Sequence, residues 1–162
     1  MARTKIAVID DDPSSVAELK SILLDRIPSI EVVAVAEPAA PIGFDIFLLE
    51  AKILELKGGK DLLQRVRSVA PNSLLLAYSS NLTTDLLRRL INEGCEGAFV
   101  KEKEEDIEQM LSRIENFRSS HRFRRPAAGG VGSTVSAITA LIREWNTRLE
   151  RNGRAYHRTY SD

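Results

Sequence analysis

The segment Lys5-Ile-Ala-Val-Ile-Asp-Asp-Asp-Pro13 joins a short apolar run to three consecutive acidic residues. The run is rich in β-branched side chains and ends abruptly, which is typical of a buried strand that leads into a polar loop. Pro13 suits the first turn of a helix, because the N–H that proline lacks would have no partner there. Apolar residues then recur at intervals of three and four from Val16 to Ile27, before Pro28. The segment therefore predicts a strand followed by an amphipathic helix.

The same alternation of patterns continues along the chain. Apolar runs predict further strands at residues 31–36, 45–49, 74–78 and 97–100, and helical patterns lie at 60–68, 83–92 and 104–117. Strands that alternate with helices favour parallel crossovers. We therefore predict an α/β fold with a doubly wound, five-stranded parallel sheet.

One crossover departs from this pattern. The sequence between the second and third strands reads Glu37-Pro-Ala-Ala-Pro-Ile-Gly-Phe44, which is too short and too proline-rich for a full helix. We expect a shortened or absent second helix here, with a loop or a single turn in its place. One sheet face near the second strand would then lack its usual cover, which the C-terminal segment or another subunit could supply.

Composition limits the kind of protein. The length of 162 residues fits one domain with an appendage, and no apolar run approaches the roughly 18 residues of a membrane span. The N-terminal residues do not resemble a signal peptide. Cys95 is the only cysteine, so no internal disulfide can form, and we expect a cytoplasmic protein.

The net charge of zero conceals a division along the chain. Residues 1–117 hold 14 Lys/Arg against 20 Asp/Glu, a balance of −6, whereas residues 118–162 hold nine Arg against three acidic residues, a balance of +6. We predict a domain at 1–117, a basic Pro/Gly-rich linker at 118–132, and an amphipathic helix with a frayed basic end at 133–162. Arginine-rich segments of this kind can bind nucleic acid, an anionic membrane surface or an acidic protein surface.

Polar residues follow four of the predicted strands. In an open parallel sheet the carboxyl ends of the strands share one edge, and ligands bind there. The residues that we expect at this edge are Asp10 and Asp11 after the first strand, Glu50 after the third, Ser79 and Ser80 after the fourth, and Lys101 after the fifth.

The order of these residues resembles that of bacterial two-component response-regulator receiver domains. VIDDDP is similar to the acidic loop of the family, FDIFLLE to its third strand, AYSS to its fourth and EGCEGAFVKE to its fifth. The resemblance covers residues 4 to about 117. It implies a flavodoxin-like fold with strand order 2-1-3-4-5.

The resemblance also implies roles for the residues at the sheet edge. In the family, two acidic residues after the first strand hold Mg²⁺, so Asp10 and Asp11 would be its ligands here. An aspartate at the end of the third strand accepts phosphate, while a Ser/Thr and a Lys orient and neutralise the phosphoryl oxygens. Ser79, with Ser80 beside it, and Lys101 match those helpers.

Glu50 stands where the family has its phosphate-accepting aspartate. Its extra methylene displaces the carboxylate by more than about 1 Å, and a misplacement of that size can reduce a rate on the order of a hundredfold. We expect phosphorylation to be very slow or lacking. The longer side chain could instead pair with Lys101 and hold one conformation.

Three further positions depart from the family. Glu102 replaces the usual proline after the lysine, Ala98 replaces the switch aromatic, and Ile53-Leu54 replaces a Met/Leu-Pro turn. We therefore predict a pseudo-receiver that is not an enzyme and acts through a signalling partner, either a kinase or an output protein, and that could form a homodimer. The alternatives are a regulator that still responds to phosphate or Mg²⁺, and a nucleic-acid-associated regulator that uses the arginine-rich segment.

The segment Gly129-Gly-Val-Gly-Ser-Thr134 resembles the deviant Walker motif of partition-type ATPases, some of which carry an N-terminal receiver-like domain. A working phosphate loop also needs a lysine, a preceding buried strand and downstream acidic residues. This sequence lacks the lysine, HRFRRPAA precedes the motif, and the chain ends soon after. A glycine-rich linker before a helix is the favoured interpretation.

Overall fold

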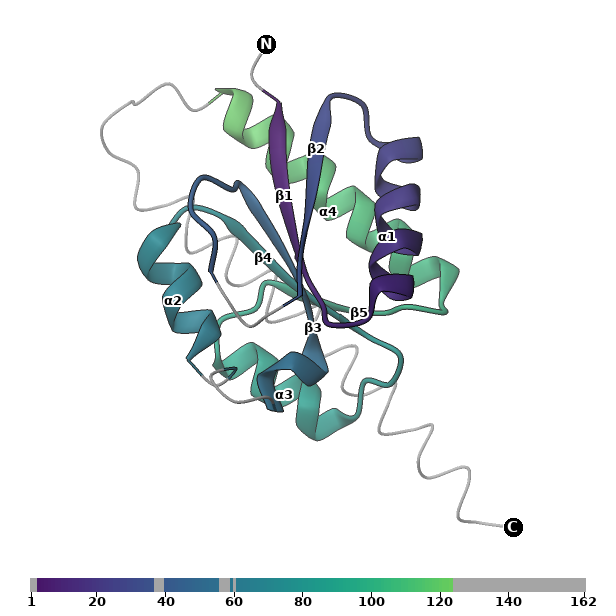
Figure 1. Ribbon diagram of the computed structural model, residues 1–162, viewed down its shortest axis with the longest axis vertical. Helices are drawn as coiled ribbons and strands as arrows, with labels where there is room; N and C mark the ends of the chain where they lie inside the picture. The colour runs from purple at the N-terminus through teal and green to yellow at the C-terminus, as the bar shows by residue number, and fades with distance from the viewer. Residues whose placement is uncertain (1–2, 37–39, 56–58, 60, 124–162) are drawn as a thin grey trace.

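A computed structural model of the chain describes residues 3–36, 40–55, 59 and 61–123 (Figure 1). The strands are β1 (Thr4–Ile9), β2 (Ile30–Val35), β3 (Ile46–Glu50), β4 (Leu74–Ser79) and β5 (Gly97–Val100). The helices are α1 (Pro13–Arg26), α2 (Leu62–Val69), α3 (Thr84–Asn92) and α4 (Glu104–Phe123), with a 3₁₀ turn, η1, at Ala51–Glu55. The predicted strands and helices are thus confirmed, with small shifts at their ends.

The five strands form one parallel sheet in the order β2-β1-β3-β4-β5, which confirms the predicted topology. In the register of the sheet, Ile9 of β1 lies opposite Leu49 of β3, and Glu50 lies opposite Tyr78 of β4. Ser79 in turn lies opposite Val100 of β5. This register places the ends of β1, β3, β4 and β5 at one edge.

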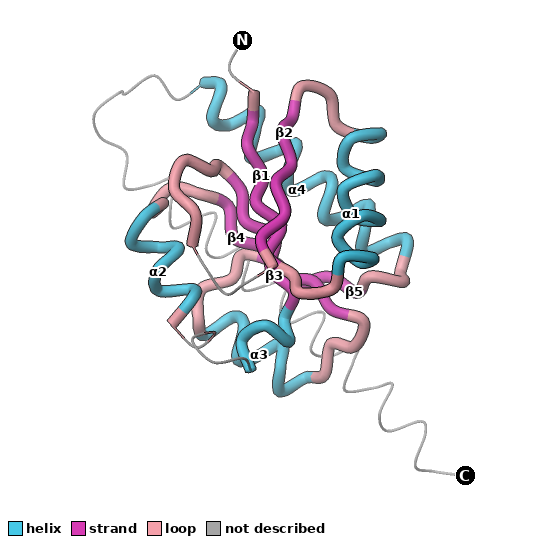
Figure 2. Tube along the Cα trace, in the orientation of Figure 1, coloured by secondary structure: helices cyan, strands magenta, loops and turns pink. Residues whose placement is uncertain are grey.

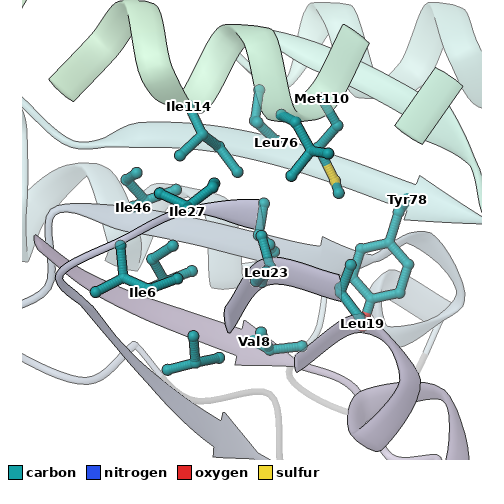
Figure 3. Packing of buried hydrophobic residues seen from close by; sticks show 14 of the residues in the cluster. Ile6, Val8, Leu19, Leu23, Ile27, Ile46, Leu76, Tyr78, Met110 and Ile114 are labelled. Atoms are coloured by element: carbon teal, nitrogen blue, oxygen red, sulfur yellow. The ribbon is translucent and has the colours of Figure 1, made fainter. Parts of the chain in front are cut away.

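Helices cover both faces of the sheet, with α1 and α4 on one face and α2 and α3 on the other (Figure 1). Alternate residues of each strand enter the two apolar cores, because successive side chains of a strand point to opposite faces. Figure 3 shows the core beneath α1 and α4, where Ile6, Leu23, Leu76 and Ile114 pack together. Tyr78 of this core follows Leu74 and Leu76 on the same face of β4.

Helix α1 begins where the acidic triplet ends. The side chain of Asp12 accepts a 3.0 Å hydrogen bond from the backbone N–H of Ser14, and Pro13 occupies the first turn. This is a side-chain N-cap, which satisfies one of the N–H groups that a helix start leaves unpaired. Asp12 therefore has a structural role that is separate from those of Asp10 and Asp11.

The connection between β2 and β3 lacks a crossover helix in its described residues, 36 and 40–45, as expected (Figure 2). Phe44 and Val35 pack partly against the core of the α2 and α3 face. Ile42 is 81% exposed, the largest exposure among the large apolar side chains described. The predicted cover by residues 133–162 lies outside the described residues.

Helix α4 extends past the predicted domain boundary at residue 117. Helix α4 continues to Phe123, and Arg118 is 5% exposed. Its guanidinium donates to the carbonyl of Pro28 at 2.7 Å, to Oγ1 of Thr4 at 3.2 Å and to Glu115 at 2.8 Å. Arg118 therefore belongs to the domain and not to a linker. Residues 124–132 of the predicted linker and the segment 133–162 lie outside the described residues.

Candidate functional site at the carboxyl edge of the sheet

The structure brings the predicted polar residues to one edge of the sheet. Asp10 directly follows β1, Glu50 and Ser79 are the last residues of β3 and β4, and Lys101 directly follows β5. Asp10, Glu50 and Ser79 are buried, whereas Lys101 is half-buried. The charged groups are therefore largely withdrawn from water. Their interactions with one another are stronger in this environment than they would be in solvent.

Both carboxylate oxygens of Asp10 accept hydrogen bonds. Oδ1 accepts from the backbone N–H of Asp12 at 2.9 Å, and Oδ2 accepts from the hydroxyl of Tyr78 at 2.7 Å. Oδ2 also lies 3.5 Å from the ammonium of Lys101. The carboxylate is thus surrounded by donors from three parts of the chain.

Lys101 interacts with Asp10, and no hydrogen bond or ion pair joins it to Glu50 among the described residues. Its Nζ donates a 2.7 Å hydrogen bond to Oγ of Ser15 on α1 and lies 4.8 Å from the centroid of the Tyr78 ring. A cation over an aromatic face is attracted by the ring quadrupole. The predicted pairing of Lys101 with Glu50 was therefore wrong, because Asp10, Ser15 and Tyr78 offer a more complete set of partners.

The side chain of Glu50 folds back onto its own turn. Its Oε2 accepts a 2.8 Å hydrogen bond from the backbone N–H of Lys52 in η1. Burial raises the pKa of Glu50 above its ordinary value, and the negative charge of Asp10 adds to this effect. The Lys52 hydrogen bond and the charge of Lys101 offset it only in part.

Asp10 titrates in the opposite sense. Burial alone would raise the pKa of its carboxyl, but the pKa lies below its ordinary value. The effects that lower it are hydrogen bonds from Asp12, Tyr78 and Ser15 and the charge of Lys101. The same neighbours act on Tyr78, whose pKa is raised by burial and by its bond to Asp10. Asp10 therefore keeps its negative charge, and Tyr78 keeps its proton.

The remaining predicted residues do not join this network. The Oγ of Ser79 is 3.2 Å from the carbonyl of Asn81, to which it donates. Ser80 and Asp11 are exposed, and neither makes a side-chain hydrogen bond or ion pair with another described residue. The edge thus brings together Asp10, Glu50 and Lys101 but leaves Asp11, Ser79 and Ser80 with other surroundings.

None of the positions that depart from the receiver-family pattern carries an aromatic side chain that could act as a switch. Ala98 is fully buried on the α2 and α3 face, opposite Ala77 of β4. Glu102 is exposed in the turn before α4, and Ile53 and Leu54 are buried in η1. A rotating side chain at residue 98 cannot therefore carry a signal across the sheet.

The Asp10 carboxylate is poorly placed to bind a magnesium ion in this arrangement. Mg²⁺ requires open carboxylate oxygens with near-octahedral geometry. Both oxygens of Asp10 are occupied by donors, and Oε2 of Glu50 is bound by Lys52. The described part of the chain holds no group of three or more His, Cys, Asp or Glu residues arranged as metal ligands. The hydrogen bonds to Asp10 oppose its expected role as a Mg²⁺ ligand, whereas the carboxylate of Asp11 is exposed and bonded to no other described side chain.

Two residues of the network were missed in the sequence. Tyr78 lies in an apolar strand pattern, and Ser15 follows Pro13 at the start of a helix pattern. A hydroxyl near the end of a buried strand is a usable signal, because a buried tyrosine hydroxyl usually needs a hydrogen-bond partner. The parity of Tyr78 with Leu74 and Leu76 places its side chain on the α1 face, which is also the face of Asp10.

Comparison with solved structures identifies the fold. DrrB of Thermotoga maritima, an OmpR/PhoB homologue, superposes with a TM-score of 0.58 at 15% identity over 74% of this chain. This chain spans only 54% of the length of DrrB. A CheY-like receiver domain protein of Methanospirillum hungatei JF-1 gives a TM-score of 0.60 at 17% identity, covering 73% of this chain and 98% of the other. The chain has the receiver fold.

A third similar structure is not described as a response regulator. A putative pilus assembly protein (cpaE) of Burkholderia thailandensis E264 has a TM-score of 0.58 and 17% identity, with 70% of this chain and 98% of the other covered. No protein-family model and no curated protein matches the sequence. At these identities the likeness shows the receiver fold and no more. In the part of the chain that the structure describes, no helix is long and apolar enough to cross a membrane.

Proposed function

We propose that this chain is a response-regulator-like signalling protein that acts through protein contacts, without accepting phosphate on Glu50. The observation that carries the proposal is the position of the Glu50 carboxylate. It lies at the end of β3, and its Oε2 is bound to the N–H of Lys52. A nucleophile must approach the phosphorus atom freely and in line, and we expect the longer Glu50 side chain, with one oxygen bonded to Lys52, to meet this requirement poorly.

The helper residues support the same proposal. Phosphoryl transfer depends on positioning and on cations that neutralise the developing charge. Lys101 is directed to Asp10 and Ser15, and the hydroxyl of Ser79 is bonded to Asn81. Neither helper faces Glu50 in the arrangement that transfer would need.

The lack of a switch aromatic supports a constant surface. With Ala98 in β5, the position where the family has its switch aromatic carries no side chain whose rotation could report an event at Glu50. A partner would then recognise the domain in one conformation. The class of partner that we propose is a kinase or an output protein of a two-component pathway, with regulation by abundance or location in place of phosphate.

Acetyl phosphate with MgCl₂ tests the proposal. The intact chain is expected to show no phosphate mass increment by mass spectrometry. Glu50→Asp, which shortens the side chain by one methylene, serves as the matched comparison and should acquire more label than the wild type. Stoichiometric, hydroxylamine-sensitive labelling of the wild type would contradict the proposal and support a phosphate-responsive regulator.

A nucleic-acid-associated role is the alternative from another class. It rests on the arginines of residues 118–162, but Arg118 is buried and bonded within the domain, so it is unavailable to a phosphate backbone. Binding that depends on phosphate contacts falls steeply with salt. DNA binding at low salt that vanishes as salt rises would favour this role, and no binding at low salt would remove it.

A second candidate function is that of a receiver-like module joined to a nucleotide-binding segment. The observation that favours it is the resemblance of the Gly129–Thr134 sequence to the deviant Walker motif. Because the segment lacks the lysine of a working phosphate loop, this candidate ranks below the proposed signalling function. Saturable binding of MgATP by calorimetry would make this candidate the leading one.

A further inference from the structure

We infer that Lys101 and Tyr78 take the place of a divalent cation at Asp10, so that this edge keeps one arrangement with or without magnesium. The inference rests on the proposed function and names a physical basis for it. A domain that carries its own counter-charge needs neither metal nor phosphate to fix its surface.

Both oxygens of the Asp10 carboxylate already accept hydrogen bonds. A magnesium ion would have to replace donors that already satisfy both oxygens. The Tyr78 bond is short, at 2.7 Å, and joins a neutral donor to an ionised acceptor inside the core. Charge-assisted bonds of this kind are about twice as strong as neutral ones. Displacing the hydroxyl would also leave it buried without a partner.

The positive charge of Lys101 lies beside the Asp10 carboxylate. The ammonium of Lys101 is held from three sides, by Oδ2 of Asp10 at 3.5 Å, by Oγ of Ser15 at 2.7 Å and by the ring of Tyr78 at 4.8 Å. It therefore sits where it neutralises Asp10, and a divalent ion at the same carboxylate would meet a fixed like charge. Repulsion between like charges is large in a largely buried site.

The contacts around Asp10 join several elements of the fold. Asp10 follows β1, Ser15 lies in α1, Tyr78 in β4 and Lys101 after β5. These contacts span up to 91 residues of the chain. A metal ion commonly provides such a cross-link between loops, whereas here side chains of the protein provide it.

Manganese serves as a paramagnetic probe for a magnesium site in the intact chain. The experiment follows amide line widths of ¹⁵N-labelled protein during a MnCl₂ titration, without any phosphate donor. The wild type is compared with Tyr78→Phe/Lys101→Met and with Lys103→Met, which removes an exposed lysine two residues away. Lys101→Met alone, which keeps the tyrosine bond, replaces the double variant if the latter does not fold.

We expect no saturable broadening at residues 10–12 in the wild type or in Lys103→Met. In the double variant the same amides should broaden saturably, with an apparent affinity at least about tenfold higher, which corresponds to about 1.4 kcal/mol. Saturable broadening of the wild type below about 1 mM, the weak end of protein cation sites, would overturn the inference. A double variant that folds but binds Mn²⁺ no more tightly than the wild type would also overturn the inference.

The two proposals can fail separately. A wild type that binds Mn²⁺ yet gains no phosphate from acetyl phosphate overturns the internal-cation inference and leaves the proposed function standing. A wild type that gains phosphate on Glu50 overturns the proposed function. Matched titrations of the three proteins therefore decide the metal question by themselves.

Discussion

The hydroxyl of Tyr78 donates a 2.7 Å hydrogen bond to Oδ2 of Asp10, a residue 68 positions away in the chain. This bond joins the apolar core beneath α1 to the polar edge of the sheet. It engages an acceptor of the residue to which the resemblance to receiver domains assigns metal binding, and the ammonium of Lys101 lies over the tyrosine ring. The site is therefore organised around an internal ion pair.

Replacing Tyr78 with Phe should lower the free energy of unfolding by about 1–3 kcal/mol at neutral pH, because a buried carboxylate loses a donor. Urea unfolding of the intact chain measures the change. The loss should be much smaller in an Asp10→Ala background, where no acceptor remains. Equal losses in both backgrounds would show that the hydroxyl does not act through Asp10.

The stability that Asp10 contributes should depend on pH in a defined direction. Its folded-state pKa lies below the ordinary value of 3.8, so the contribution is fully present above that value. It is lost as the pH falls through the folded-state pKa. The stability difference between the wild type and Asp10→Asn should therefore shrink on acidification below about pH 4. A difference that stays constant to lower pH would contradict this assignment.

Glu50 should behave in the opposite way. Its folded-state pKa is raised above the ordinary value of 4.5, so its charge opposes folding at neutral pH. Glu50→Gln keeps an oxygen that can accept from Lys52 and removes the buried charge. It should unfold at higher urea concentration than the wild type at pH 7, by roughly 1.4 kcal/mol for each unit of pKa elevation. The advantage should disappear below about pH 4.5, where glutamate is protonated.

Glu102→Gln is the control for this comparison, because Glu102 is exposed and lies near the same edge. It should change stability by less than about 0.5 kcal/mol. A Glu50→Gln variant that is less stable than the wild type at pH 7 would mean that the charge on Glu50 stabilises the fold.

The sequence pattern predicted the parallel sheet and its polar edge because both depend on local patterns, whereas the strand order followed from the resemblance to receiver domains. Apolar runs define buried strands, and the residue after each run must lie at the carboxyl edge of a parallel sheet. The direction of Lys101 could not be predicted in this way. It depends on Ser15 and Tyr78, which come from two other elements and become neighbours only after packing.

The end of α4 shows a second limit of sequence patterns. Apolar residues at 107, 110, 111, 114 and 117 follow helical spacing, and Arg118 then occupies a buried position on the same helix. An arginine in a core position ends the apolar pattern without ending the helix. Its guanidinium is satisfied by Thr4, Pro28 and Glu115, none of which the pattern around residue 118 reveals in advance.

Arg118→Ala should therefore destabilise the domain by about 2–4 kcal/mol, since it removes several hydrogen bonds to a charged group and leaves the Pro28 carbonyl unpaired. Thermal or urea unfolding of the intact chain is the measurement. Arg88→Ala, which changes an exposed arginine of α3, is the control and should be nearly neutral. Equal stability of the two variants would mean that Arg118 contributes no more to the fold than an exposed arginine.

Burial raises the pKa of the Cys95 thiol to about 12, and the side chain is 5% exposed. The thiolate is the reactive form, so the native thiol should react with Ellman's reagent far more slowly than the thiol of the unfolded chain. Following the reaction with and without guanidinium chloride measures this ratio. Fast labelling of the native protein would contradict the packing around Cys95.

The central claim is that phosphate chemistry at Glu50 does not set the conformation of this domain. Its most direct test is the ¹H–¹⁵N amide spectrum of the intact chain before and after saturating beryllofluoride and MgCl₂, since beryllofluoride mimics a phosphoryl group on a carboxylate. The account predicts unchanged resonances at Glu50, Ser79 and Lys101, and in α3 and β5. A second set of resonances at these positions, in slow exchange with the first, would contradict it.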